Sequence, residues 1–79
     1  IHILVIPKKP FCSFTDFSKK ADAKFMHEFI RSINLIAEEL DLKEGYRLIT
    51  NIGNYGGQEV PHLHFHLLSG KKIGKMVSA

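Results

Sequence analysis

The chain has 79 residues, a net charge of +3 and 44% hydrophobic residues. This length predicts one domain over residues 1–79, and the hydrophobic content is too high for a disordered protein. A domain of this size buries only a modest core, so we expect it to depend on a partner subunit or on further segments. Because the sequence starts inside an apolar run at Ile1, we expect the chain to be a piece of something longer.

The composition also disfavours several locations and partners. Cys12 is the only cysteine, so no internal disulfide is possible and a reducing cytoplasmic location is expected. No apolar stretch approaches the roughly 20 residues that a membrane span needs. The lysine pairs are scattered, which is typical of a solvated surface and not of a nucleic-acid-binding stripe. We therefore expect no membrane and no nucleic acid as partners, while the mild positive field favours small anions such as nucleotides.

The first half of the chain predicts a strand, a loop and a helix. Residues 1–6 are rich in β-branched side chains and predict a buried strand, and residues 8–17 predict a loop. Over residues 21–40, apolar side chains recur at spacings of three and four, which predicts one amphipathic helix. Ser18 or Asp22 is expected to cap this helix. His27 lies beside its polar face, so we interpret it as a surface histidine.

The second half predicts two strands that flank a loop. Residues 46–52 alternate weakly and predict a strand, residues 53–57 form a glycine-rich loop, and residues 62–68 predict the last strand before a basic tail. A short connection favours antiparallel pairing of these two strands. The expected fold class is therefore α+β, with a long helix packed on one face of an antiparallel sheet.

Residues 62–66 read HLHFH, and this spacing is the main functional signal in the chain. Side chains alternate faces along a strand, so the three histidines share one face while the apolar residues between them can pack under the helix. Neighbouring imidazoles on that face would stand about 7 Å apart along the strand, close enough to bind one small group together. The three histidines are His62, His64 and His66.

Three interpretations of this pattern compete. A polar strand face that carries three histidines by chance is improbable because histidine is a rare residue. A metal site is possible because His-x-His is a common zinc donor pair. However, residues 60–79 contain no Asp or Glu, and three positions in a line do not easily converge on one tetrahedron.

The third interpretation is nucleophilic and acid–base catalysis on a phosphate. A neutral imidazole is a competent nucleophile near pH 7, and flanking imidazoles can orient it and move protons. Glycines at 53, 56 and 57 would let backbone N–H groups approach an anion closely. Asn51 and Gln58 add side-chain donors. An anion-binding loop that leads directly into a histidine strand indicates phosphoryl or nucleotidyl transfer.

At this point the residues resemble a known family. Residues 62–68 fit the histidine triad signature, His-φ-His-φ-His-φ-φ with φ apolar, at all seven positions. Residues 2–8 (HILVIPK), 45–47 (GYR) and 56–60 (GGQEV), together with Asn51, are similar to the nucleotide-binding (Hint) branch, and most of all to its bacterial members. The resemblance covers nearly the whole chain and keeps the order of elements.

The resemblance implies a HIT-like α+β fold, a homodimer and a hydrolase or nucleotidyl transferase for purine nucleoside phosphoramidates or related nucleoside monophosphate derivatives. It implies no metal and no other cofactor. The implied catalytic roles are a nucleophile that forms a nucleotidyl–histidine intermediate (His64), a relay to the leaving group (His62), a phosphate contact (His66) and a fourth histidine beside the triad (His2). The implied phosphate-binding residues are Asn51, Gly57, Gln58, Glu59 and Val60.

The sequence departs from the family in two places. Members carry an N-terminal segment before the strand that starts at Ile1, and that segment holds the ribose and the base. Pro61 also occupies a position that is often aromatic, although proline is tolerated at the first residue of a strand. Two alternatives remain beside the enzyme: a module that binds a nucleotide or a protein without turnover, and a histidine-rich metal-binding domain.

Overall fold

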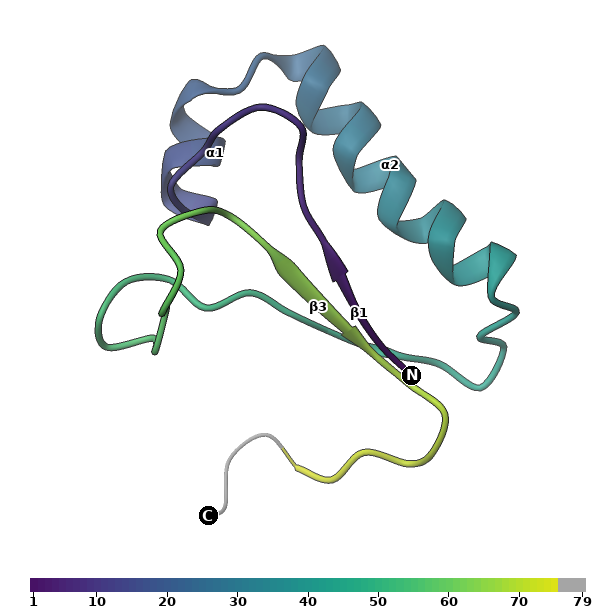
Figure 1. The fold of residues 1–79 in the computed structure, drawn as a ribbon. Helices are drawn as coiled ribbons and strands as arrows, with labels where there is room; N and C mark the ends of the chain where they lie inside the picture. The colour runs from purple at the N-terminus through teal and green to yellow at the C-terminus, as the bar shows by residue number, and fades with distance from the viewer. Residues whose placement is uncertain (76–79) are drawn as a thin grey trace.

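A computed structural model describes residues 1–75 and shows an α+β fold, which confirms the predicted class (Figure 1). The sheet is antiparallel and three-stranded, in the order β1-β3-β2. Its strands are β1 (His2–Val5), β2 (Arg47–Ile49) and β3 (Phe65–Leu68). β3 is central, because Leu67 lies opposite Ile3 on one side and opposite Leu48 on the other.

The long helix α2 (Ala23–Glu39) begins and ends at residues suited to those positions. The Asp22 carboxylate accepts a hydrogen bond from the Phe25 backbone N–H at 2.8 Å, so Asp22 is the N-cap, as one of the two predictions had it. After the helix, Asp41 adopts a left-handed conformation (φ 57°), and the Leu42 N–H donates to the Ala37 carbonyl at 3.1 Å. This is a Schellman-type helix end.

A second helix, α1 (Phe14–Lys20), replaces the later part of the loop predicted over residues 8–17, so that prediction is wrong there. The Ser13 hydroxyl accepts a hydrogen bond from the Asp16 N–H at 3.3 Å, which caps the first turn. Phe17 lies in the buried core with 3% exposure. A helix this short is marginal alone, so its packing through Phe17 is what stabilises it.

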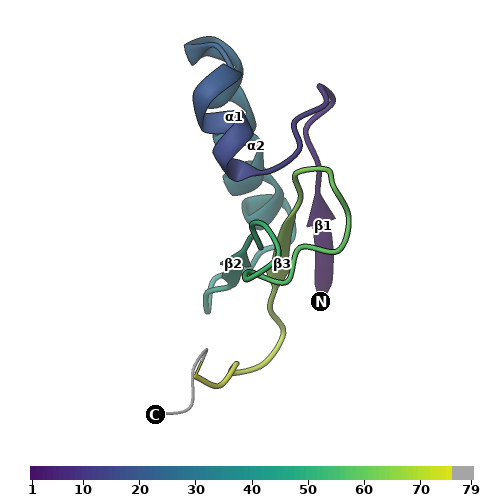
Figure 2. The same cartoon turned by 90° about the vertical axis from the view of Figure 1, so that its left-hand side faces the viewer.

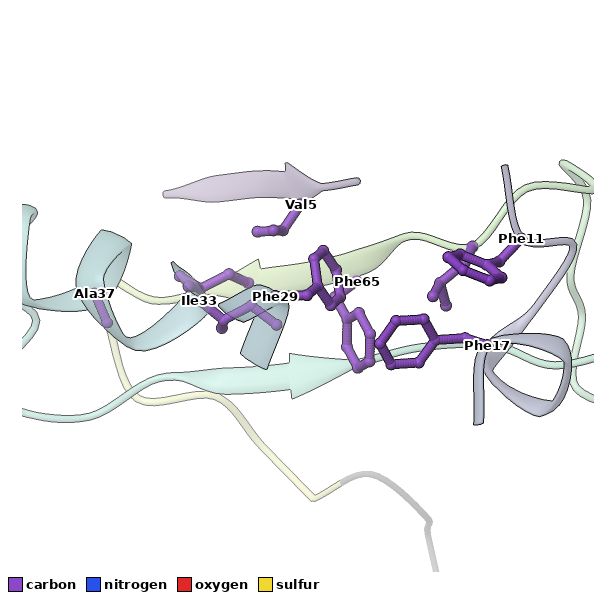
Figure 3. Packing of buried hydrophobic residues seen from close by; sticks show 9 residues of the cluster. Val5, Phe11, Phe17, Phe29, Ile33, Ala37 and Phe65 are labelled. Atoms are coloured by element: carbon purple, nitrogen blue, oxygen red, sulfur yellow. The ribbon is translucent and has the colours of Figure 1, made fainter. Parts of the chain in front are cut away.

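The core lies between the two helices and one face of the sheet. Figure 2 shows both helices on the same side of β1 and β3, and Figure 3 shows the Phe29 and Phe65 rings between α2 and β3. The apolar residues that alternate with the histidines are buried as predicted, since Leu63, Phe65 and Leu67 are 1%, 7% and 0% exposed. The core residues are Val5, Phe11, Phe17, Phe29, Ile33, Ala37, Leu63, Phe65 and Leu67.

The predicted face of α2 is confirmed only in part. Phe29, Ile33 and Ala37 are buried, whereas Ile30 and Leu40, which also follow the spacing of three and four predicted over residues 21–40, are 51% and 41% exposed. None of the helices within residues 1–75 has both the length and the apolar character needed to cross a membrane.

Both strands of the second half are shorter than predicted. The ladder between them stops at the pair Ile49–His66, and residues 50–64 form a long connection in place of a short hairpin loop. His62 and His64 therefore precede β3 and are held by other contacts. Most of the predicted basic tail is described, but residues 76–79 lie outside the described range.

Candidate active site

The predicted histidines lie together on the face of the sheet that the helices do not cover. His62, His64 and His66 are half-buried and alternate with fully buried residues, although only His66 belongs to β3. His2 comes from β1 and is exposed. His27 is exposed on α2, outside this group, which confirms its interpretation as a surface histidine.

His62 is held by the backbone of the segment before α1. Its Nδ1 lies 3.2 Å from the Phe11 carbonyl oxygen, and the Leu63 N–H donates to the same oxygen at 2.8 Å. A carbonyl oxygen can only accept, so the His62 Nδ1 carries the proton. The other ring nitrogen, Nε2, is then the one that can accept a proton from a bound molecule or return it.

The His64 ring is also fixed by a hydrogen bond from Nδ1 to a backbone carbonyl. Its Nδ1 lies 2.9 Å from the carbonyl oxygen of His62, two residues earlier, and must be the donor of that bond. In the neutral ring this leaves the Nε2 lone pair unprotonated. A hydrogen bond that sets the tautomer in this way also orients the ring, which is what a nitrogen nucleophile requires.

His66 forms a ring-to-ring hydrogen bond with His2. The two nitrogens, His2 Nε2 and His66 Nδ1, are 2.8 Å apart, and the ring centroids are 5.0 Å apart. The His64 and His66 rings meet edge to face at 5.1 Å. Burial lowers the pKa of His66 below its usual value, and the neighbouring His64 and His2 lower it further. His66 is therefore neutral at pH 7.

The glycine-rich loop is closed by hydrogen bonds of its own. Gly53 and Gly57 have positive φ values of 67° and 76°, which glycine adopts at little cost. The Gln58 N–H donates to the Gly53 carbonyl at 3.0 Å, and the Gly57 N–H donates to the Asn54 carbonyl at 3.1 Å. The loop is thus a compact turn with a defined shape.

The Gln58 side chain joins this loop to the segment before α1. Its oxygen accepts from the Gly53 N–H at 3.0 Å, and its nitrogen donates to the carbonyls of Cys12 (2.6 Å) and Val60 (3.0 Å). The Gln58 side-chain amide, which the sequence suggested as a donor to a phosphate, is therefore engaged with protein oxygens in this conformation. Gln58 therefore shapes the approach to the histidines.

The other predicted phosphate-binding residues lie along the same connection. Asn51 is half-buried just after β2, whereas Glu59 and Val60 are exposed shortly before His62. In Figure 2 the green part of the connection that leads into β3 curves away from the helices. All of these residues thus belong to the single connection between β2 and β3.

Three residues of the site were missed by sequence reasoning. The backbone carbonyls of Phe11 and Cys12 accept the bonds from His62 and Gln58, and the Thr50 hydroxyl donates to the His64 carbonyl at 2.8 Å. Backbone oxygens carry no sequence signal, because every residue has one. Thr50 could have been noticed only as a hydroxyl at the end of a predicted strand.

The geometry offers no ready metal site in the described part of the chain. Within residues 1–75, no group of three His, Cys, Asp or Glu side chains is placed to hold one metal ion. His2 and His66 use facing nitrogens for each other, and the Nδ1 atoms of His62 and His64 face carbonyl oxygens. The arrangement instead suits a small group that contacts the remaining nitrogens.

Comparison with known families shows to which family this chain belongs. A family model described as the HIT domain matches residues 1–73. The chain belongs to the HIT domain family. The resemblance seen in the sequence is thereby confirmed, and the match includes all the histidines of the site.

Individual relatives agree with this assignment. This chain is 47% identical over 74 residues to a HIT-like protein of Rickettsia prowazekii, and the match covers 92% of this chain and 62% of the relative. It is 38% identical over 78 residues to a HIT-like protein of Azospirillum brasilense, covering 98% of this chain and 64% of the relative. The chain thus spans less than two-thirds of the length of these relatives.

Solved structures show the same fold. A HIT family hydrolase from Clostridium thermocellum superposes with a TM-score of 0.83 at 38% identity, over 98% of this chain and 68% of that one. A histidine triad protein from Clostridium difficile gives a TM-score of 0.79 at 42% identity, over 96% of this chain and 66% of that one. The HIT domain described here therefore has the fold of known histidine triad proteins.

Proposed function

We propose that this HIT domain hydrolyses purine nucleoside phosphoramidates, or related esters and anhydrides of nucleoside monophosphates, through a nucleotidyl–histidine intermediate on His64. The observation that carries the proposal is the bond from the His64 Nδ1–H to the His62 carbonyl at 2.9 Å. It leaves the His64 Nε2 lone pair as the nucleophile. The similarity to the HIT family hydrolase from Clostridium thermocellum supports hydrolysis in general.

The first step is a displacement at phosphorus. The His64 Nε2 forms a bond to phosphorus as the bond from phosphorus to the leaving nitrogen or oxygen breaks. The leaving group must gain a proton, and a protonated His62 can donate it from Nε2 while its Nδ1–H stays on the Phe11 carbonyl. In the second step water attacks phosphorus, loses its proton to His62, and releases the nucleoside monophosphate and His64.

His66 and His2 complete the proposal as a phosphate-binding pair. If the His2 Nε2–H donates across the 2.8 Å contact, the His66 Nδ1 accepts and its Nε2 carries the remaining proton. A neutral His66 then offers an N–H donor to a phosphate oxygen. Asn51 and the backbone from Gly57 to Val60 are assigned to the same phosphate, and Gln58 contributes through the loop shape or after rearrangement.

A homodimer and a cytoplasmic location belong to the same proposal. β1 and β2 are the edge strands of the sheet, and Leu48 on β2 is 41% exposed, so further pairing at an edge has a physical basis. Light scattering of the whole gene product should give twice the chain mass. A monomeric mass at micromolar concentration would contradict the dimer.

The decisive test is turnover by the whole gene product with adenosine 5′-phosphoramidate. We expect His64→Ala to abolish release of adenosine monophosphate, and acid-quenched wild-type protein to carry one nucleotidyl group by intact mass. His27→Ala removes an exposed histidine on α2 and should keep the wild-type rate. Equal rates for His64→Ala and wild type would refute the proposal, and tight nucleotide binding without turnover would favour a binding module.

A further inference from the structure

Thr50 makes a hydrogen bond to the backbone of His64 that the proposed chemistry does not use. Its hydroxyl donates to the His64 carbonyl oxygen at 2.8 Å, in a partly buried position. Thr50 is the first residue after β2, and His64 is the last residue before β3. Since the ladder between the two strands stops at the pair Ile49–His66, this side chain extends the connection one step beyond the last backbone pair.

The segment 62–64 carries two of the histidines yet belongs to no strand. The Phe11 carbonyl fixes its beginning by accepting from the Leu63 N–H at 2.8 Å. Thr50 fixes its end. The bond from the His64 ring to the His62 carbonyl, 2.9 Å long, lies wholly inside this segment. Its geometry therefore depends on how both ends of the segment are held.

We infer that Thr50 is a positioning residue for His64, an inference that rests on the proposed function for its effect on turnover. Without the hydroxyl, the His64 carbonyl loses its donor, and a partly buried carbonyl without a donor turns toward water. The peptide unit between His64 and Phe65 then rotates. This rotation shifts the His64 Cα, and the ring moves away from the His62 carbonyl. Thr50 acts through this backbone and is not assigned any contact with the substrate.

Ser69 provides a matched control within the same pair of strands. Its hydroxyl donates to the Gly45 carbonyl at 2.7 Å, just beyond the other end of the β2–β3 ladder. Both bonds join a hydroxyl to a carbonyl across the same two strands, but only the Thr50 bond is made to a histidine of the site. Thr50→Val removes the hydroxyl and keeps the shape, and Thr50→Ser keeps the hydroxyl.

The first measurement does not depend on activity. Long-range ¹H–¹⁵N correlation spectra of the whole gene product report which ring nitrogen of His64 carries the proton. We expect a single Nδ1–H form in the wild type, Thr50→Ser and Ser69→Ala. We expect Thr50→Val to show a mixture with the Nε2–H form. If Thr50→Val does not fold, Thr50→Ala takes its place.

The second measurement is single-turnover formation of the nucleotidyl–His64 intermediate. We expect Thr50→Val to lower its rate at saturating substrate by about tenfold, with KM changed less than about twofold, because small displacements of a reacting group are costly. Thr50→Ser and Ser69→Ala should match the wild type.

The two measurements distinguish a failure of the positioning role of Thr50 from a failure of the proposed hydrolase function. Wild-type spectra and rates in Thr50→Val, or equal changes in Thr50→Val and Ser69→Ala, would overturn the positioning role. If the wild type shows no turnover while Thr50→Val still changes the His64 tautomer, the positioning role stands and the proposed hydrolase function fails.

Discussion

His66 lies directly opposite Leu4 of β1 and, on its other side, opposite Ile49 of β2. Side chains opposite each other in an antiparallel sheet share a face, so the imidazole stands between two aliphatic residues. This environment removes water from the ring, and loss of water disfavours the charged form. The lowered pKa of His66 therefore has a structural cause in the register of the sheet.

The lowered pKa of His66 predicts a pH dependence of stability. The unfolded chain has the ordinary histidine pKa of about 6.5 and the folded chain a lower one, so between these values the unfolded state binds more protons. The free energy of unfolding should therefore fall as the pH drops from about 6.5 toward the folded pKa. Urea unfolding from pH 5 to 8 should show a weaker fall for His66→Gln.

His27→Gln is the control for this pH dependence, because His27 is an exposed histidine on α2. It should keep the wild-type pH profile of the free energy of unfolding. An identical profile for His66→Gln and the wild type would contradict the role given to His66.

Leu67 should be among the most costly positions to truncate. It is 0% exposed at the centre of β3, so Leu67→Ala should lower the free energy of unfolding by about 2–5 kcal/mol, through lost burial and the cavity left behind. Leu35→Ala, at a position 57% exposed on α2, should change it by less than about 0.5 kcal/mol. Similar losses in the two variants, measured in urea, would contradict this placement of the core.

Gly56 should tolerate no side chain. A Cβ at this position would lie 2.2 Å from the carbonyl oxygen of Ile52, a backbone atom that cannot swing aside. We expect Gly56→Ala to lower the free energy of unfolding by about 1–3 kcal/mol, the usual cost of overpacking. A Cβ at Gly74 would have no atom within 4 Å, so Gly74→Ala should leave the free energy of unfolding unchanged. Thermal unfolding of both variants measures this difference. A Gly56→Ala variant as stable as the wild type would contradict the close approach of Gly56 to the Ile52 carbonyl.

Gln58 should control the opening of the glycine-rich loop. Its side-chain oxygen accepts from the Gly53 N–H at 3.0 Å, so Gln58→Ala should speed amide hydrogen exchange at Gly53 by about tenfold, equivalent to about 1.4 kcal/mol. Glu59→Ala changes the exposed neighbour and should leave that exchange unchanged. Unchanged exchange in Gln58→Ala would mean that the side chain does not close the loop.

The tertiary structure decided several features that no local pattern could show. α1 is encoded in part by Ser13 and Asp16, yet a seven-residue helix becomes stable only when Phe17 enters a core built from distant segments. The ends of the strands were also set by long-range contacts, because pairing stops where the chain turns into the glycine-rich loop after Ile49.

The sequence by itself determined the α+β class, the long helix and the alternation that separates the histidines from the buried residues, because these depend on periodicity along the chain. It also placed the histidines of the site together through the family signature. Only the tertiary structure decided how the rings of His62 and His66 are held, since the Phe11 carbonyl and the His2 ring come from segments far away in sequence. Ring orientation depends on such distant partners, which periodicity cannot specify.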